Sequence, residues 1–225
     1  MNTAIIVAAG SGTRFGAEKP KQFLEIGGKP LLIYTLESFE RCPAIDGILL
    51  VLASDEIENF RKTLEKFNLK KLEQIITGGK TRAESVLNAI NSLNGKHVEI
   101  VAVHDGARPF VASAEIMQTI EKARETGAAC LVGKLTDTIK QIADDKIVGT
   151  IDRENLRRAL TPQTFRFEIL QKAFAPENFE ASATDECFLV EKVGFAIAFV
   201  EGSAKNIKIT TREDFAIAER FLAEK

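Results

Sequence analysis

Short runs of β-branched residues alternate with amphipathic segments through the first half of the chain, and this alternation constrains the fold more than any other feature. Each run has the length of a strand, and each amphipathic segment is long enough for a helix. The successive pairs are Ala4–Ala8 with Leu31–Glu40, Ile48–Leu52 with Glu56–Phe67, Gln74–Ile76 with Thr81–Leu93, and Val98–Val103 with Ala114–Glu125. Such pairs are typical of βαβ units. The sequence therefore predicts an α/β fold with a mostly parallel sheet.

The regular succession ends after Gly133. Two strands are predicted there, Lys134–Ile142 and Ile147–Ile151, on either side of a polar turn. We therefore expect a hairpin outside the βα succession, and we call residues 134–153 the β-arm. The remaining predicted elements are helices at Phe167–Phe174, Asp185–Val193 and Arg212–Ala223, a strand at Phe195–Val200 and a strand-like segment at Asn206–Thr210.

Length and charge limit the number of domains and the classes of partner. A chain of 225 residues is long enough for one sizeable domain and short for two. We therefore expect a single domain over residues 1–225, with the β-arm as its subregion. The formal net charge of −2 gives no field that would gather nucleic acid or an anionic membrane, so neither is expected as a partner.

Cysteine usage and hydropathy favour a cytoplasmic location. The cysteines are Cys42, Cys130 and Cys187. They are far apart and form no C-x-x-C pair, which argues against a disulfide framework and a zinc knuckle. The apolar run Ala4–Ala9 is shorter than the roughly 7–15 residues of a signal peptide and the about 20 of a membrane span. With only two histidines, a multi-histidine metal site is nearly excluded.

A glycine-rich segment with three cations follows the first predicted strand. It reads Ala8-Ala9-Gly10-Ser11-Gly12-Thr13-Arg14-Phe15-Gly16, then Lys19-Pro20-Lys21-Gln22. Glycines let the backbone approach a phosphate closely, and Arg14, Lys19 and Lys21 supply charge that a triphosphate needs before a second phosphate can approach. The Rossmann and P-loop spacings are both absent. We interpret the segment as a loop that activates a nucleoside triphosphate; a solvated surface loop is the alternative.

The strand candidate Val98–Val103 runs into His104 and Asp105. In open parallel sheets, ligands bind outside the carboxyl ends of the strands, so Asp105 is a candidate Mg²⁺ ligand. The alternative is a turn residue that caps the strand. We expect His104 to be structural, because a phosphate nucleophile needs no general base.

Two segments are consistent with either ligand binding or helix capping. Gly78 and Gly79 could contact a base or sugar through backbone groups, together with Ser85. The alternative is that Thr81 is a helix N-cap, which explains the same segment equally well. Thr184 also precedes a helix with acids in its first turn, which is ordinary N-cap chemistry.

Three further polar positions have plain structural alternatives. Lys208 alternates with Ile207 and Ile209, so its side chain should face away from theirs, with solvent as the default surrounding. In the β-arm, Thr138 and Arg153 lie at strand ends, where charge and polarity can simply protect an edge.

The motifs occur in a fixed order along the whole chain. They are Ala8-Ala9-Gly10-x-Gly12-x-Arg14, Pro20-Lys21-Gln22, Gly78-Gly79, Arg82-x-x-Ser85, His104-Asp105-x-Ala107-Arg108-Pro109, Asp137-Thr138, Asp152-Arg153, Leu160-Thr161-Pro162-Gln163, Thr184-Asp185-Glu186 and Asn206-Ile207-Lys208. Together they closely resemble the 2-C-methyl-D-erythritol 4-phosphate cytidylyltransferases of the non-mevalonate isoprenoid pathway. The resemblance implies a Rossmann-like, twisted sheet flanked by helices, of the nucleotidyltransferase type, with a protruding β-hairpin arm.

The same resemblance implies a reaction and a set of roles. Methylerythritol phosphate would attack the α-phosphorus of CTP, giving CDP-methylerythritol and pyrophosphate, with Mg²⁺ or another divalent cation required. The implied catalytic residues are Arg14, Lys21, Lys208 and Arg153; those for the nucleotide are Ala8, Ala9, Gly10, Gly12, Gly78, Gly79 and Ser85; those for the second substrate are Asp105, Arg108, Thr138, Arg153 and Thr184, with Asp105 also near the metal. Part of the second set would come from the arm of a partner subunit in a homodimer.

Two other functions remain open on the sequence. The sister family of ribitol 5-phosphate cytidylyltransferases uses a similar loop and fold. A non-catalytic nucleotide-binding module would also keep the fold, although it would have little reason to neutralise two phosphates at once.

Overall fold

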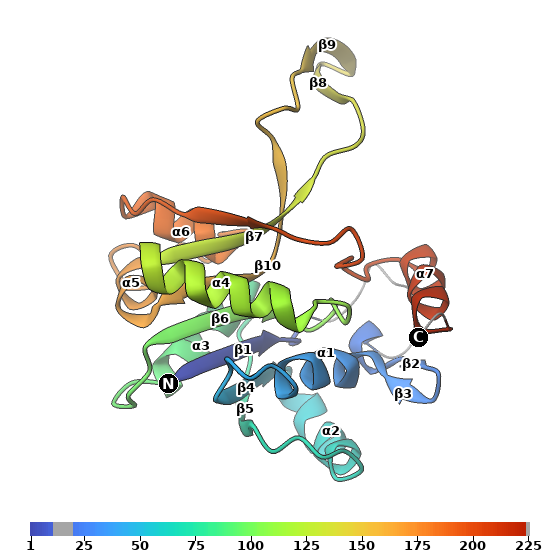
Figure 1. Ribbon diagram of the computed structural model, residues 1–225, viewed down its shortest axis with the longest axis vertical. Coiled ribbons are helices and arrows are strands. Elements are labelled where there is room, and N and C mark those ends of the chain that lie inside the picture. The colour runs from blue at the N-terminus through green and yellow to red at the C-terminus, as the bar shows by residue number, and fades with distance from the viewer. Residues whose placement is uncertain (11–19, 224–225) are drawn as a thin grey trace.

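A seven-stranded sheet forms the centre of the computed structural model (Figure 1), which describes residues 1–10 and 20–223. The strands are β1 (Asn2–Val7), β4 (Gly47–Leu52), β5 (Leu72–Thr77), β6 (Ile100–Asp105), β7 (Ala128–Lys134), β10 (Arg157–Arg166) and β11 (Ala198–Glu201). Their order is β11-β7-β10-β6-β1-β4-β5. Within this described sheet, β10 alone runs antiparallel to its neighbours. The predicted mostly parallel sheet is confirmed.

Helices cover both faces of this sheet (Figure 1). They are α1 (Leu31–Glu40), α2 (Ile57–Leu64), α3 (Arg82–Ser92), α4 (Ser113–Thr126), α5 (Phe167–Ala173), α6 (Glu186–Lys192) and α7 (Arg212–Ala223). Helices α1, α2 and α4 pack with Ala4 and Ile6 of β1, whereas α3, α5 and α6 pack with Ile5. Since successive strand side chains point to opposite faces, a strand covered on both sides is apolar throughout. This explains why apolar runs located the central strands.

A third, smaller apolar cluster holds α7 beside the main body. Ala218 of α7 packs with Ile26 and Ile209 in this cluster. Ile26 belongs to a short hairpin of β2 (Glu25–Ile26) and β3 (Lys29–Pro30), whose turn residues Gly27 and Gly28 have φ of 57° and 76°. Glycine is the residue that adopts such angles without steric cost. The described residues also form two single 3₁₀ turns, η2 (Lys21–Phe23) and η3 (Ser54–Glu56).

The β-arm contains a hairpin that is separate from the main sheet and projects away from it (Figure 1). Its strands are β8 (Ile139–Ala143) and β9 (Lys146–Ile151), and they pair only with each other within the described sheets. The turn residues Asp144 and Asp145 have φ of 47° and 59°, as a tight hairpin turn requires. The predicted hairpin is confirmed, although its first strand begins at Ile139, because Lys134 ends β7.

The structure corrects the prediction at two unpredicted strands and at one segment that is not a strand. Strands β7 and β10 lie where no element was named. The segment Asn206–Thr210 is not a strand: its backbone donates one bond toward β6, from Ile209 N to the Ala107 carbonyl at 2.9 Å, instead of forming a ladder. Within the described part of the chain, no helix is long and apolar enough to cross a membrane.

Candidate active site

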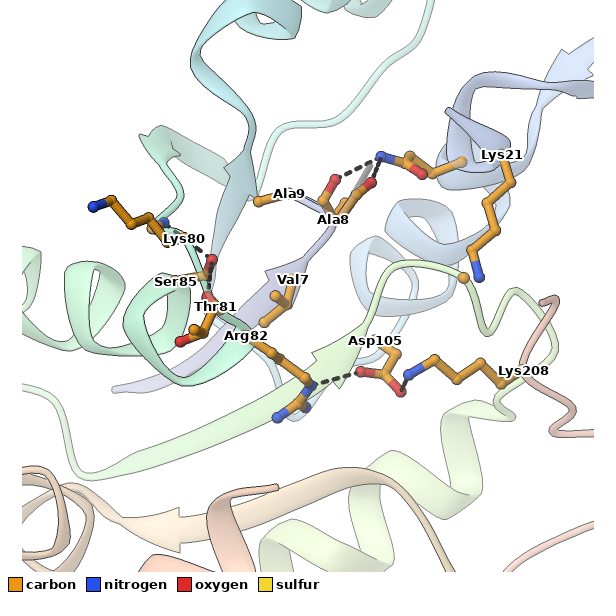
Figure 2. Close-up of a pocket in the computed structure, with 14 residues that line it drawn as sticks. Val7, Ala8, Ala9, Lys21, Lys80, Thr81, Arg82, Ser85, Asp105 and Lys208 are labelled. Atoms are coloured by element: carbon orange, nitrogen blue, oxygen red, sulfur yellow. Dashed lines mark hydrogen bonds and ion pairs between the residues drawn. The ribbon is translucent and has the colours of Figure 1, made fainter. Parts of the chain in front are cut away.

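A cavity of about 400 Å³ lies where β1 and β6 end (Figure 2). Its walls come from the segment after β1, the turn η2, the beginning of α3 and the segment before α7. Among the described residues, the lining consists of Val7, Ala8, Ala9, Gly10, Lys21, Gln22, Gly79, Lys80, Thr81, Arg82, Ser85, Asp105, Ala107 and Lys208. This is the edge at which open α/β sheets bind ligands.

Positive charge dominates the described lining. The lining includes the cations Lys21, Lys80, Arg82 and Lys208 but only one acidic side chain, Asp105. Lys21 and Lys208 enter from one side in Figure 2 and Arg82 from the other, with Asp105 between Arg82 and Lys208. Such an excess of fixed cations favours a polyanionic ligand, such as a polyphosphate.

Glycines allow the walls to approach one another. A Cβ at Gly78 would lie 2.3 Å from the Cβ of Ala9, and a Cβ at Gly106 would lie 2.8 Å from the Cβ of Ala8. Real carbon atoms do not come so close without a shift of the backbone. The two glycines therefore let the turns after β5 and β6 pack directly against the segment that follows β1.

Gln22 ties the beginning and the end of the glycine-rich segment together. Its buried amide donates from Nε2 to the carbonyl of Ala8 at 2.8 Å and to the carbonyl of Gly10 at 3.0 Å. These bonds hold η2, and with it Lys21, against the end of β1. A buried amide with its donors satisfied in this way fixes the local backbone.

Asp105, the last residue of β6, lies within a cluster of cations. Its Oδ1 accepts from Nε of Arg82 at 3.1 Å, and its Oδ2 contacts Nζ of Lys208 at 2.9 Å and Nε of Arg108 at 3.3 Å. Burial raises the pKa of Asp105, but the charges of Arg82, Lys208 and Arg108 outweigh it and hold this pKa well below its usual range. The carboxylate is therefore ionised at neutral pH.

His104 is enclosed beneath this cluster. It is fully buried, with Nε2 at 3.1 Å from the Arg108 carbonyl and Nδ1 at 3.0 Å from Oγ1 of Thr161. Burial lowers the pKa of His104 to about 4, so the ring is neutral at pH 7. His104 is not among the cavity residues, which agrees with the structural role predicted for it.

Comparison with known proteins decides the family. The family model described as IspD, 2-C-methyl-D-erythritol 4-phosphate cytidylyltransferase, matches residues 2–224. A curated protein of that name from Clostridium perfringens is 42% identical over 221 residues, which cover 97% of each chain. This chain belongs to the 2-C-methyl-D-erythritol 4-phosphate cytidylyltransferase family. It is therefore a member of a nucleotidyltransferase family, as the motifs predicted.

Solved structures agree with this family assignment. The crystal structure of 4-diphosphocytidyl-2C-methyl-D-erythritol synthase from Anaerococcus prevotii superposes with a TM-score of 0.86 at 30% identity, covering 99% of this chain and 96% of that one. Among curated sequences, a bifunctional IspD/IspF enzyme of Desulfotalea psychrophila is 41% identical over the whole of this chain, which spans 58% of the length of that enzyme. These matches do not favour the ribitol 5-phosphate alternative or the non-catalytic module.

The cavity brings together most of the residues that the family resemblance assigned to the nucleotide. Ala8, Ala9, Gly10, Gly79 and Ser85 line it, as do the predicted catalytic residues Lys21 and Lys208. Gly78 lies directly behind Ala9. Gly12 and Arg14 lie outside the described residues, so their predicted roles stay predictions.

The turn before α3 is both a helix cap and a wall of the cavity. Thr81 and Glu84 form a capping box, which confirms the structural alternative. Oγ of Ser85 accepts from Gly79 N at 3.1 Å and donates to the Thr81 carbonyl at 2.9 Å. A ribose or base that binds Ser85 would therefore meet a hydroxyl whose proton is already engaged.

Four residues predicted for the second substrate do not line the described cavity. Arg108 is close but buried, donating from Nη1 to the Asn206 carbonyl at 2.9 Å as well as contacting Asp105. Thr184 precedes α6, whose N-cap is Asp185 rather than Thr184, because Oδ1 of Asp185 accepts from Phe188 N at 3.0 Å. Thr138 and Arg153 are exposed on the β-arm.

The expectation of a solvated Lys208 is corrected. Its ammonium contacts Oδ2 of Asp105, and the side chain is 37% exposed. Strand alternation could not reveal this contact, because the segment is not a strand. Instead, Asn206 anchors it by donating from Nδ2 to the Thr161 carbonyl at 2.9 Å.

The described residues do not make a metal site by themselves. No group of three His, Cys, Asp or Glu side chains in the described ranges 1–10 and 20–223 could hold a metal ion. Both oxygens of Asp105, the predicted ligand, are engaged by cations. A divalent cation bound there would have to displace Arg82 or Lys208 from the carboxylate.

Sequence reasoning assigned no role to three residues that organise this site: Gln22, Arg82 and Glu186. The guanidinium of Arg82 bridges Asp105 and Glu186. All three residues stood within motifs of the family pattern, Pro20-Lys21-Gln22, Arg82-x-x-Ser85 and Thr184-Asp185-Glu186, so the signal was present. What was missing was the distance across the fold, since Arg82 and Glu186 are 104 positions apart.

Proposed function

We propose that this chain transfers the cytidylyl group of CTP to 2-C-methyl-D-erythritol 4-phosphate, giving CDP-methylerythritol and pyrophosphate for isoprenoid precursor biosynthesis. One observation carries the proposal. In a chain that matches this family from residue 2 to residue 224, Lys21, Asp105 and Lys208 line one cation-rich cavity at the carboxyl ends of the strands.

The chemistry of the reaction explains the need for these cations. A phosphate oxygen of the polyol forms a bond to the α-phosphorus of CTP, and the bond from that phosphorus to the bridging oxygen of the β-phosphate breaks. The nucleophile is already anionic, so no base is required, and the barrier lies in bringing two anions together. We assign Lys21 to the triphosphate, together with Arg14, and Lys208 to the polyol phosphate.

We propose that Mg²⁺ or another divalent cation is needed and that oxygens of the triphosphate supply most of its ligands. Mg²⁺ is commonly held by one or two carboxylates together with substrate phosphates. Its chemical contribution would be to neutralise charge on the triphosphate. Asp105 is the candidate protein ligand at the cavity, subject to the rearrangement of its cation contacts.

We also propose that the chain forms a homodimer in which the partner's arm completes each site with Thr138 and Arg153. None of the described residues that line the cavity comes from the β-arm. The arm exposes four large apolar side chains, Ile142, Ile147, Val148 and Ile151. A two-stranded hairpin is marginally stable alone, so such a surface favours a partner.

A cytoplasmic location is supported by the three free, buried cysteines.

The test is an assay of pyrophosphate release that offers CTP, UTP, ATP or GTP with either methylerythritol phosphate or ribitol 5-phosphate. We expect turnover with CTP and methylerythritol phosphate that is lost on addition of EDTA and restored by excess Mg²⁺. Turnover of ribitol 5-phosphate instead would overturn the substrate assignment. Binding of CTP without turnover of either polyol would support a non-catalytic module.

A further inference from the structure

A chain of alternating charges runs from α6 to the segment before α7 across the base of the cavity. Glu186 accepts from Nη1 of Arg82 at 2.5 Å and from Nη2 at 3.1 Å, through its two oxygens. The Nε of Arg82 donates to Oδ1 of Asp105 at 3.1 Å. Oδ2 of Asp105 then contacts Nζ of Lys208 at 2.9 Å. Four distant parts of the sequence are linked in this order.

Glu186 is the buried end of this chain of charges. It is 1% exposed and does not line the cavity. Burial raises its pKa, and the charge of Arg82 opposes that shift. Taking a carboxylate out of water is costly, and breaking such a pair leaves an uncompensated charge. The contact with Arg82 therefore favours the ionised form of Glu186.

Gln163 holds Glu186 in place. Its Oε1 accepts from the backbone N of Glu186 and of Cys187, each at 3.0 Å, and its Nε2 donates to Oδ2 of Asp185 at 2.9 Å. Gln163 lies on β10 and is itself buried. The first turn of α6 is thus bound to the central sheet, which makes Glu186 a rigid anchor.

This anchor restricts what Arg82 can do. A guanidinium that lines a cavity is well suited to bind a phosphate through its two Nη groups. Glu186 takes one bond from each Nη, and Asp105 takes the bond from Nε. Arg82 is consequently held between two carboxylates, with a fixed orientation toward Asp105.

We infer that Glu186 and Arg82 are positioning residues: they fix the carboxylate of Asp105 and, through it, the ammonium of Lys208, which the proposed function assigns to the polyol phosphate. The inference rests on the proposed function for the role of Lys208. It adds a buried pair, one member of which never contacts substrate, to the set of residues on which the reaction depends.

The test compares Glu186→Gln with Glu191→Gln, the same substitution at an exposed position of α6. Glutamine keeps the shape of Glu186 but presents an N–H group to one Nη of Arg82, which frees the guanidinium. We expect kcat/KM for the polyol phosphate to fall about 100-fold in Glu186→Gln, because small misplacements of reacting groups have effects of that size. The KM for CTP should stay within about threefold, and Glu191→Gln should match the parent chain.

Arg82→Lys is a second variant, for the case in which Glu186→Gln does not fold. It keeps a cation beside the buried carboxylate of Glu186. Lysine cannot bridge Glu186 and Asp105 as the guanidinium does. If Arg82 is a positioning residue, Arg82→Lys should therefore lose as much kcat/KM for the polyol phosphate as Arg82→Met. Equal activity of Arg82→Lys and the parent would overturn the inference, since charge alone would then suffice. If Arg82 and Glu186 act together, kcat/KM of the double variant Arg82→Lys/Glu186→Gln should be no lower than that of the less active single variant. A loss of kcat/KM equal to the product of the two single losses would show that the two residues act independently and would contradict the inference.

Failure of the proposed function can be told apart from failure of the positioning role. The parent chain is assayed first with both polyol phosphates, and failure with methylerythritol phosphate counts against the proposed function alone. The variants are then compared with the parent on whichever polyol phosphate it uses. A Glu186→Gln enzyme within about threefold of Glu191→Gln would overturn the positioning role while leaving the proposed function intact.

Discussion

Lys21 is the residue for which the structure gives the sharpest expectation. It lines the cavity from the turn that Gln22 ties to the end of β1. We expect Lys21→Ala to lower kcat by about 100- to 1,000-fold, because a fixed donor at a developing charge is worth about 3–4 kcal/mol. Steady-state kinetics with saturating CTP measures this, and circular dichroism should show an unchanged fold.

The matched control is Lys70→Ala, which removes an exposed lysine that is not among the lining residues. It should keep the parent rate. If both variants turned over at the parent rate, the cavity charge contributed by Lys21 would have no part in the chemistry.

His104 should make stability depend on pH. Its pKa falls from the ordinary value near 6.5 to about 4 on folding. Between these values the unfolded chain binds a proton that the folded chain does not, so stability is lost as the pH falls. From pH 7.5 to pH 5 this single group lowers the free energy of unfolding by about 2 kcal/mol.

Urea unfolding at pH 7.5 and pH 5 measures the loss of unfolding free energy. The test compares this loss between the variants and the parent chain. His104→Gln should be less stable at pH 7.5, since the ring packs 4.9 Å from that of Phe39, but its stability should change less with pH. His97→Gln, at the exposed second histidine, serves as the control. An equal pH dependence in His104→Gln and the parent would refute the assignment.

Among the elements, the turn between β5 and α3 tests whether close packing shapes the cavity. A Cβ on Gly78 would lie 2.3 Å from Cβ of Ala9 and 3.3 Å from the Leu52 carbonyl. We expect Gly78→Ala to push Ala9 into the cavity, raising the KM for CTP at least about tenfold and costing about 1–3 kcal/mol of stability. Kinetics and thermal unfolding measure the two effects.

Gly133 on β7 offers the comparison. A Cβ there would have its nearest neighbour at 3.4 Å, in ordinary contact with Leu160. Gly133→Ala should therefore leave the KM for CTP unchanged. An unchanged KM in Gly78→Ala as well would mean that the turn can move away from Ala9 and does not define the nucleotide site.

Elements with a strong local pattern were predictable, whereas those held by distant contacts were not. Helix α1 has the predicted bounds because its apolar residues pack on the sheet at regular spacing. Strand β10 was not predicted: it begins with Arg157 and Arg158, contains Pro162, and shifts register against β7 between Ala159 and Gln163. Such a strand depends on its neighbours more than on its own sequence.

The site shows the same division at the level of residues. Glycines and cations after the first strand predicted a ligand site at this edge of the sheet, and Lys21 does line a cavity there, whereas the place of Lys208 was implied only by the family resemblance. The bridge from Glu186 through Arg82 to Asp105 was not predictable from local pattern, because it joins residues from three separate elements. Its geometry follows from the order of the strands.

At the scale of the whole molecule, the projecting β-arm poses the main functional question. The arm leaves the sheet after β7 and returns at β10, and it extends away from the main body of the chain (Figure 1). Arg153, predicted to act on the second substrate, donates to the Thr136 carbonyl within the arm and is exposed. Its proposed action is therefore on the site of a partner, and an experiment with mixed subunits can decide this.

Mixing Arg153→Ala subunits with Lys21→Ala subunits should restore activity if each site combines Lys21 of one chain with Arg153 of the other. Random exchange makes half of the dimers mixed, and each mixed dimer has one intact site, so recovery should reach roughly a quarter of the parent activity. If Lys21 and Arg153 acted within one chain, every site would lack one of them and no recovery would follow. Activity of the mixture is measured after exchange has been verified with subunits that carry two different tags. Verified exchange without recovery would rule out sites shared between subunits and would leave the exposed apolar side chains of the arm without a catalytic explanation.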